Sequence, residues 1–280
     1  MVLPNHDCRI FYHAKTDIFT LMIPTDINCK TINNREDIVS LDPGEKKFIS
    51  FFGLNSYGYI GKDIRKPILK LRNKISKYQK ILAKKKNKCG NKIKNKKNIK
   101  NKITKAYRKI KNIVKELHNQ TAFYLCNNYD KILLPKFEIQ KMIGNKKSFK
   151  KYKLDFINNG KTITEKKENA KILTKKCRLN KNVKYTLGCL SHYSFRQHLQ
   201  NKSLEYGCEL KIITEEYTSL TCTNCGVISN KYNKRLKICN NCNLCIDRDY
   251  NGARNILIKN LNVFNYEAIT PMVTYKPNDI

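Results

Sequence analysis

Two pairs of cysteines in one short segment constrain the fold of this chain more than any other feature. In the segment TCTNCGVISNKYNKRLKICNNCNLC, the pairs are Cys222/Cys225 and Cys239/Cys242, with residues 226–238 between them. A CxxC turn presents two sulfurs to the same ion, and four thiolates satisfy the tetrahedral coordination of Zn²⁺. The spacing therefore predicts a closed structural zinc site, in which residues 226–238 form a small hairpin that brings the two pairs together.

The other cysteines do not repeat this arrangement. Cys245 follows Cys242 at CxxC spacing and is an alternative to it as the fourth ligand. The remaining seven are scattered singly: Cys8, Cys29, Cys89, Cys126, Cys177, Cys189 and Cys208. Isolated cysteines in a chain that is not secreted are usually small buried hydrophobic residues, and a single CxxC pair would be enough for redox chemistry. We therefore expect metal ligation in the cluster and no disulfide framework.

The apolar pattern along the chain predicts a mixed α/β fold. Turn residues such as Pro43-Gly44 separate the expected strands, and Cys89-Gly90 separates two expected helices. The predicted elements are, in order, a hairpin at 8–24, strands at 38–42, 48–52 and 57–60, two helices between 64 and 117, a strand at 131–137, a helix at 190–207, a strand at 208–214, the cysteine cluster, and a helix from 248. Residues 145–184 are weakly periodic, and we expect a loop or insertion there.

Three sequential strands followed by alternating helices and strands give a sheet with mixed pairing. This element order resembles that of the RNase H-like (RuvC) fold, in which the first strand lies centrally and carries an acidic residue. The final helix of that fold brings a second acidic residue beside the first. We expect the helix at 190–207 to place one stripe of side chains near the core: Leu190, Tyr193, His198 or Leu199, and Leu204.

Carboxylates stand at three points of this predicted fold. Asp42 closes the first sheet strand, Glu215 and Glu216 follow the strand at 208–214, and Asp249 lies in the first turn of the last helix. Considered singly, each has an ordinary explanation as a turn, surface or helix-start residue. Together, they are expected to converge in an RNase H-like sheet. Three such carboxylates can hold two Mg²⁺ ions that hydrolyse a phosphodiester.

The charge of the chain indicates a polyanionic partner. The formal net charge is +35 over 280 residues, and the stretch from residue 64 to 115 contains many lysines and arginines but no acidic residue. An excess of this size favours nucleic acid as the partner. The alternatives are a composition biased by an AT-rich genome and a basic helix face that is merely solvated. An uninterrupted run of one sign repels itself, which favours contact with phosphates.

Several motifs resemble one family. EEYTSLTCTNCG, CNNC and DRDYNGARNI resemble the C-terminal signature of TnpB-type proteins (OrfB transposases) and their eukaryotic and viral relatives, the Fanzor proteins. IVSLDPGEKKF resembles their first RuvC motif, LLPKFEIQKM the segment around the second, and LSHYSFRQHL the helix before the zinc ribbon. The resemblance implies a transposon-encoded, RNA-guided, Mg²⁺-dependent DNA endonuclease, with DNA and a guide RNA as partners.

The resemblance also implies roles for individual residues. Asp42 matches the first catalytic acid and Asp249 the third, with Asp247 a neighbour of the ligand; the four clustered cysteines match the zinc ligands. The second acid is open, because Pro135 stands where many bacterial members have a glutamate. Some members use a glutamate just before YTS, which favours Glu215. Glu216 and Glu138 are the alternatives.

The resemblance covers residues 8–258, and family members usually carry a longer segment before the first motif. The sequence therefore predicts a chain shortened at its N-terminus, and an inactive remnant that only binds nucleic acid is the alternative function. A structural RNA-binding protein is a third. We expect a soluble intracellular protein, because the chain has neither a signal peptide nor a long apolar run. The expected division is a remnant or linker at 1–37, a RuvC-like domain at 38–219 with a helical insertion at 64–126, a zinc ribbon at 220–246, a final helix at 247–260 and a tail at 261–280.

Overall fold

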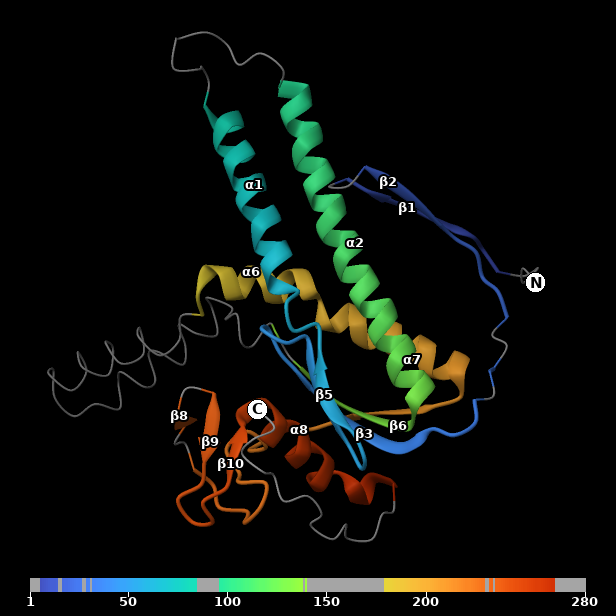
Figure 1. The fold of residues 1–280 in the computed structure, drawn as a ribbon. Helices are drawn as coiled ribbons and strands as arrows, with labels where there is room; N and C mark the ends of the chain where they lie inside the picture. Colours follow the sequence, from blue (N-terminus) through green and yellow to red (C-terminus); the bar gives the residue numbers. More distant parts are fainter. Residues whose placement is uncertain are drawn as a thin grey trace, which may run out of the picture.

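The centre of the fold in the computed structural model is a five-stranded mixed sheet (Figure 1). The structure describes residues 6–14, 17–26, 29–30, 32–84, 96–137, 139, 179–229, 232–233 and 235–264. The strands are β3 (Glu36–Pro43), β4 (Ile49–Gly53), β5 (Tyr57–Ile60), β6 (Tyr129–Pro135) and β7 (Glu209–Ile213). Their order across the sheet is β5-β4-β3-β6-β7.

Strand β3 lies at the centre of this sheet. It pairs antiparallel with β4, which pairs antiparallel with β5, whereas the β3–β6 and β6–β7 pairs are parallel. Tight turns make the first three strands consecutive neighbours; in one of them, the N–H of Gly53 donates to the carbonyl of Ser56 at 2.7 Å. The parallel pairs need the intervening helices as crossovers. The predicted mixed α/β fold of RNase H-like strand order is confirmed.

Helices α1 (Arg65–Ala83) and α2 (Lys96–Asn128) confirm the two predicted basic helices and run side by side (Figure 1). Ile75 of α1 packs with Ala106 and Ile110 of α2 in a small apolar cluster of their own. Helix α2 continues beyond the predicted stripe because Ala122 and Leu125 are fully buried in the main core.

A helix occupies part of the segment that we expected to be a loop or insertion. Helix α6 (Lys181–Leu190) begins inside residues 145–184, because the side chain of Asn180 caps it by accepting from the N–H of Asn182 at 2.9 Å. The expectation is therefore wrong for this end of the segment. Residues 140–178 lie outside the described part of the chain.

Helix α7 (His192–Tyr206) confirms the predicted helix before the last strand. Ser191, with φ of 47°, separates it from α6, and Gly207, with φ of 65°, ends it in the left-handed conformation that glycine adopts without strain. The predicted apolar stripe is partly wrong. Tyr193 and Leu204 are 64% and 60% exposed. The buried residues of this helix are His192, Phe195, Leu199, Ser203 and Tyr206.

The two faces of the sheet are covered differently. Helices α2 and α7 cover one face, in a core that includes Leu41, Phe48 and Phe195. Helix α8 (Arg248–Lys259) covers the other, where its buried residues pack on Ile38, Phe52 and Leu133. The short helix η1 (Leu261–Phe264) follows. Helix α8 therefore lies directly against the strand that carries Asp42.

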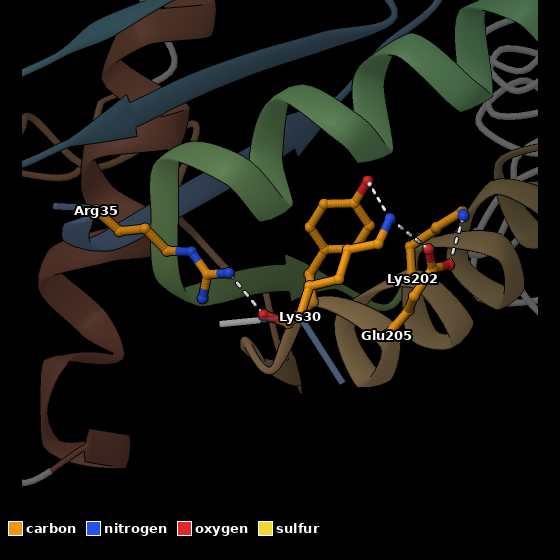
Figure 2. A network of polar contacts seen from close by, with 5 residues as sticks. Lys30, Arg35, Lys202 and Glu205 are labelled. Carbon is orange, nitrogen blue, oxygen red and sulfur yellow. Dashed lines mark hydrogen bonds and ion pairs between the residues drawn. The ribbon is translucent and has the colours of Figure 1, made fainter. Parts of the chain in front are cut away.

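The predicted N-terminal hairpin forms a separate two-stranded sheet of β1 (Arg9–His13) and β2 (Ile18–Met22). The chain between this hairpin and β3 is fixed to the end of α7 by a polar network (Figure 2). Lys30 Nζ lies 3.0 Å from one carboxylate oxygen of Glu205, and Lys202 binds the other. Arg35 donates to the carbonyl of Tyr206 at 2.6 Å. This network anchors the entry into the central strand.

None of the helices that the structure describes is long and apolar enough to cross a membrane.

Candidate metal-binding acid pocket and cysteine cluster

The carboxylate of Asp42 lies between the central strand and α8. Asp42 pairs with Ser50 of β4, and the neighbouring residue on the same face, Ser40, donates to the carbonyl of Ala253 in α8 at 2.7 Å. A methyl group at Gly252 would lie 2.7 Å from Oδ2 of Asp42, closer than side-chain carbons approach in real structures. The absence of a side chain at Gly252 therefore gives the Asp42 carboxylate its space.

Two further acids reach the same pocket from different elements. Glu215 follows β7, and Asp249 lies in the first turn of α8, where Asp247 caps the helix by accepting from the N–H of Asp249 at 2.8 Å. All three acids line one pocket of about 460 Å³, together with the cations Lys46, Lys47, Arg235 and Arg248. The structure thus brings Asp42, Glu215 and Asp249 to one place, as the sequence predicted.

The electrostatics of this pocket suit a bound cation. Burial, and after it the nearby Asp249 and Glu215 carboxylates, raise the pKa of Asp42 to about 8, while Arg248 and Lys47 oppose the rise. Burial also raises the pKa of Glu215. A divalent cation would supply the positive charge that stabilises these carboxylates in their ionised form, and their hard oxygen atoms are the ligands that Mg²⁺ prefers.

The carboxylate oxygens of Asp42, Glu215 and Asp249 are not close enough together to form one metal-ligand group. Among the described residues, the four clustered cysteines are the one group of three or more such side chains whose ligand atoms all lie within 4.8 Å of one another. Oδ2 of Asp249 instead lies 3.1 Å from Lys47 Nζ and 3.8 Å from Arg235 Nη2. Of the three acids, Asp249 is therefore already paired with cations of the chain.

The alternatives for the second acid are placed differently. Glu216 is next to Glu215 but points away from the pocket, with a side chain that is 73% exposed and lies 3.6 Å from Lys259 Nζ. Glu138 lies outside the described residues. Pro135 ends β6 opposite Ile213 of β7, so the two parallel strands end together and a residue just after β7 reaches the same edge of the sheet.

The cysteine cluster is assembled as predicted. Cys222 Sγ lies 3.6 Å from Cys242 Sγ, and Cys225 Sγ lies 3.5 Å from Cys239 Sγ. All four sulfurs fall in the group that is able to share one metal ion, and Cys245 is not a member of it. This geometry favours Cys242 over Cys245 as the fourth ligand.

Local turns shape the two cysteine pairs. Gly226, with φ of 75°, closes the first turn, in which its N–H donates to the carbonyl of Cys222 at 3.0 Å. In the second, the N–H of Asn243 donates to the carbonyl of Cys239 at 2.9 Å. Hydrogen bonds from the backbone N–H of Val227 and then from the side chain of Asn241 lower the pKa of Cys225 to about 6, which favours the thiolate that binds metal. The donor set and its turns thus fit a metal ion.

A small three-stranded sheet holds the two pairs together. It has the order β10-β9-β8, with β8 (Tyr232–Asn233), β9 (Leu236–Ile238) and β10 (Cys245–Asp247). The predicted hairpin between the pairs is confirmed, and β10 is an addition that leads directly into α8 (Figure 1). The cysteine cluster and the third acid are therefore connected by a single short strand.

Sequence reasoning missed Lys47 and Gly252, which shape the acid pocket. Lys47 is 4% exposed and lies in the turn of DPGEKKF, immediately before the buried Phe48. Its position between an acidic residue and a buried strand was the one signal available. Gly252 stands inside a helix, where glycine is unfavourable, and such a glycine often marks a close approach.

The sequence matches two family models. Residues 23–146 match the model described as "Probable transposase" (OrfB_IS605), and residues 192–256 match "Cas12f1-like, TNB domain". Together, the two matches include the segment of Asp42, the cysteine cluster and the start of α8.

Several known proteins are similar to this chain in sequence or structure. TnpB-like protein L770 of Acanthamoeba polyphaga mimivirus is 26% identical over 257 residues, which are 92% of this chain and 44% of that protein. The CRISPR-associated endodeoxyribonuclease Cas12f1 of Sulfoacidibacillus thermotolerans is 33% identical over 81 residues, or 28% of this chain and 19% of that protein. A cryo-EM structure of a CRISPR-Cas12f ternary complex is similar with a TM-score of 0.47 and 17% identity, covering 85% of this chain and 41% of that one. The chain spans less than half the length of each of these proteins.

Proposed function

Because this chain is a TnpB-type protein, we propose that it is a transposon-encoded DNA endonuclease whose divalent metal ions are held by Asp42, Glu215 and Asp249. The observation that carries this proposal is the acid pocket. Three carboxylates from the central strand, from the turn after β7 and from the last helix line one cavity, and burial with mutual repulsion raises the pKa of Asp42 to about 8. Carboxylates arranged in this way are typical of sites that bind divalent metal ions.

Magnesium ions, when bound, would activate water and stabilise the leaving oxygen of a phosphodiester. The chain's own residues define where that chemistry occurs. Asp42 is fixed between β3 and α8, Asp249 is fixed by its place in the first turn of α8, and Glu215 closes the pocket from β7. Arg235 and Arg248 also line this pocket, and we assign them contacts with the phosphates of the substrate.

We assign nucleic acid as the partner, with DNA as the substrate and an RNA guide that selects it. The net charge of +35 supports this assignment, as does the row of lysines on α1 and α2. The cysteine cluster is assigned a structural zinc ion, because four thiolates leave no position open for catalysis. The domain division expected from the sequence belongs to this proposal, with a zinc ribbon at 220–246 inserted before the final helix of a RuvC-like domain.

Cleavage of DNA by the purified chain with its co-purifying RNA and Mg²⁺ tests the proposal. Asp42→Ala and Glu215→Ala are expected to abolish cleavage, whereas Glu216→Ala, one residue away and pointing outward, is the matched control and is expected to retain it. Loss of cleavage with Glu216→Ala but not with Glu215→Ala would reassign the second acid. A wild-type chain that binds DNA but never cuts it would identify a binding protein instead.

A further inference from the structure

Two asparagines of α8 hold the backbone segment that leads into the first cysteine pair. Asn251 and Asn255 are one helical turn apart and are 0% and 8% exposed. Nδ2 of Asn255 donates to the carbonyls of Thr218 and Thr221, at 2.7 Å each. Nδ2 of Asn251 donates to the same two carbonyls, at 3.4 Å and 2.9 Å. We call Asn251 and Asn255 the asparagine clasp.

The clasp also reaches into the cysteine cluster itself. Oδ1 of Asn251 accepts a hydrogen bond from the backbone N–H of Thr223 at 3.1 Å. Thr223 stands between Cys222 and Cys225 in the chain. The backbone N–H of Cys222 donates a hydrogen bond to the carbonyl of Val227 at 2.9 Å. A change in the conformation of this cysteine pair would therefore move the bonding partner of Asn251.

The same clasp reaches the second candidate acid. Thr218, whose carbonyl the clasp holds, donates from its Oγ1 and its N–H to the carbonyl of Glu215, at 2.8 Å and 3.3 Å. Asp249 lies two residues before Asn251 in the same helix. These hydrogen bonds thus connect the backbone of Glu215 and the first cysteine pair to α8, the helix that carries Asp249.

Buried amides and carbonyls of this kind are costly to leave without partners, so the clasp favours one arrangement of the segments that it joins. Resting on the proposed function, we propose that the asparagine clasp couples the two metal sites: a zinc ion in the cysteine cluster holds residues 218–223 in place, and the clasp transmits that placement to Glu215 and Asp249. Asn251 and Asn255 are positioning residues. Because coupling between two ligands is reciprocal, zinc raises the affinity of the acid pocket for a divalent ion, and that ion raises the affinity for zinc.

Binding of Mn²⁺ to the zinc-loaded full chain without nucleic acid tests the coupling, with electron paramagnetic resonance as the readout. The double variant Asn251→Ala/Asn255→Ala is expected to bind Mn²⁺ about 10-fold more weakly or worse, which is the range for residues that orient metal ligands. Asn260→Ala is the matched control. Asn260 is also a buried asparagine near the end of α8, but its side chain donates to Ile256 within its own helix, at 2.8 Å. Equal Mn²⁺ affinities in the clasp and control variants would overturn the inference.

A zinc-free background tests the coupling from the side of the cysteine cluster. In Cys225→Ser/Cys242→Ser, Mn²⁺ affinity is expected to fall as in the clasp variant, and the combined variant is expected to be no weaker than either alone. Additive losses would show that the two act independently and would overturn the coupling. If the double clasp variant does not fold, the single variant Asn251→Ala is measured by hydrogen exchange. Faster exchange at residues 209–218 supports the inference, and unchanged exchange there overturns it.

This experiment also separates the inference from the proposed function. Wild-type Mn²⁺ binding that is lost in Asp42→Asn establishes the acid site, whatever the clasp variants show. If the wild type does not bind Mn²⁺, or if Asp42→Asn binds it equally well, the proposed acid site fails and the coupling fails with it.

Discussion

Lys47 Nζ lies 3.1 Å from Oδ2 of Asp249 and 3.3 Å from Oδ2 of Asp247, so a buried lysine joins the cap and the first turn of the last helix. The same ammonium group lies over the ring of Tyr59, 3.1 Å from its centroid, and the Tyr59 ring stacks on Tyr250 of α8 with centroids 4.1 Å apart. Lys47 is 4% exposed. The lysine therefore supplies positive charge inside the acid pocket before any metal ion does.

Replacing Lys47 by methionine should destabilise the metal-free chain by roughly 1–2 kcal/mol, because it removes the nearest cation of two carboxylates. The loss is moderate because Asp249 keeps Arg235 at 3.8 Å and is only partly shielded from solvent. Added Mg²⁺ should restore more stability in the variant than in the wild type, since the ion takes over the role of the ammonium group. Thermal unfolding with and without Mg²⁺ measures both effects. Lys70→Met, at an exposed lysine of α1 that does not line the pocket, is the control. Equal losses in the two variants would contradict this account.

A methyl group at Gly252 should disturb Asp42 selectively. Gly252→Ala places its methyl carbon 2.7 Å from Oδ2 of Asp42, so the carboxylate must move. Mn²⁺ affinity and DNA cleavage should both fall by about 10-fold or more, in the range found for disturbed metal ligands.

Gly188→Ala in α6 is the matched control for Gly252→Ala, because nothing lies within 4 Å of the position that its methyl group would take. There, the higher helix propensity of alanine should raise the free energy of unfolding by about 1 kcal/mol, and Mn²⁺ binding should not change. If Gly252→Ala also bound Mn²⁺ normally, the close approach of α8 would not matter for the pocket.

Much of this fold could be predicted from the sequence, because turns and periodic apolar residues mark its strands. Asp42, placed at the end of a buried strand before Pro43-Gly44, was found in this way, and its strand is central. The apolar spacing gave a partly wrong prediction for α7, where only some of the apolar residues at that spacing are buried. Tyr193 and Leu204 have apolar side chains at the expected spacing, yet both are exposed. Helix α7 turns Phe195 to the core, beside Leu199, which the expected stripe included as an alternative to His198. Packing against α2 and the sheet decides that choice, and it is not encoded in spacing alone.

The ion pairs of Lys47 with Asp247 and Asp249 could not be predicted from the sequence, because they too depend on tertiary packing. Lys47 lies 200 residues before Asp247 in the chain, and Asp249 follows Asp247 by two residues. Only the sheet, which places the β3–β4 turn beside the start of α8, brings their charges together. The cysteine cluster was predictable because its ligands and their spacing lie within one short segment.

His192 should make the fold sensitive to acid. Its Nε2–H donates to the carbonyl of Gly44 at 3.1 Å, and its ring stacks on Phe48. Its Nδ1 is buried and has no hydrogen-bond partner among the residues that the structure describes. Burial lowers the pKa of His192 from 6.5 to about 4. The unfolded chain therefore binds a proton at this position more tightly than the folded one, and stability is lost as the pH falls from 6.5 towards 4. The loss should approach about 3 kcal/mol at the lower end.

Urea unfolding at pH 7.5 and pH 5, compared with His192→Phe, isolates this contribution. Asp42 titrates in both proteins and cancels in the comparison. The variant should lose less stability between the two pH values than the wild type. An identical pH dependence in both would show that His192 does not titrate in this range.

The last prediction concerns the identity of the fourth zinc ligand in the cysteine cluster. Cys242 Sγ lies 3.6 Å from Cys222 Sγ and belongs to the group of four, whereas Cys245 begins β10 and does not belong to it. The purified chain should carry one zinc ion, which Cys242→Ser should lose and Cys245→Ser should retain. Metal analysis of the purified proteins measures this directly. Since structural zinc sites contribute folding free energy, the thermal stability of Cys242→Ser should fall with its zinc content. Retention of zinc by Cys242→Ser together with its loss from Cys245→Ser would reassign the ligand to Cys245.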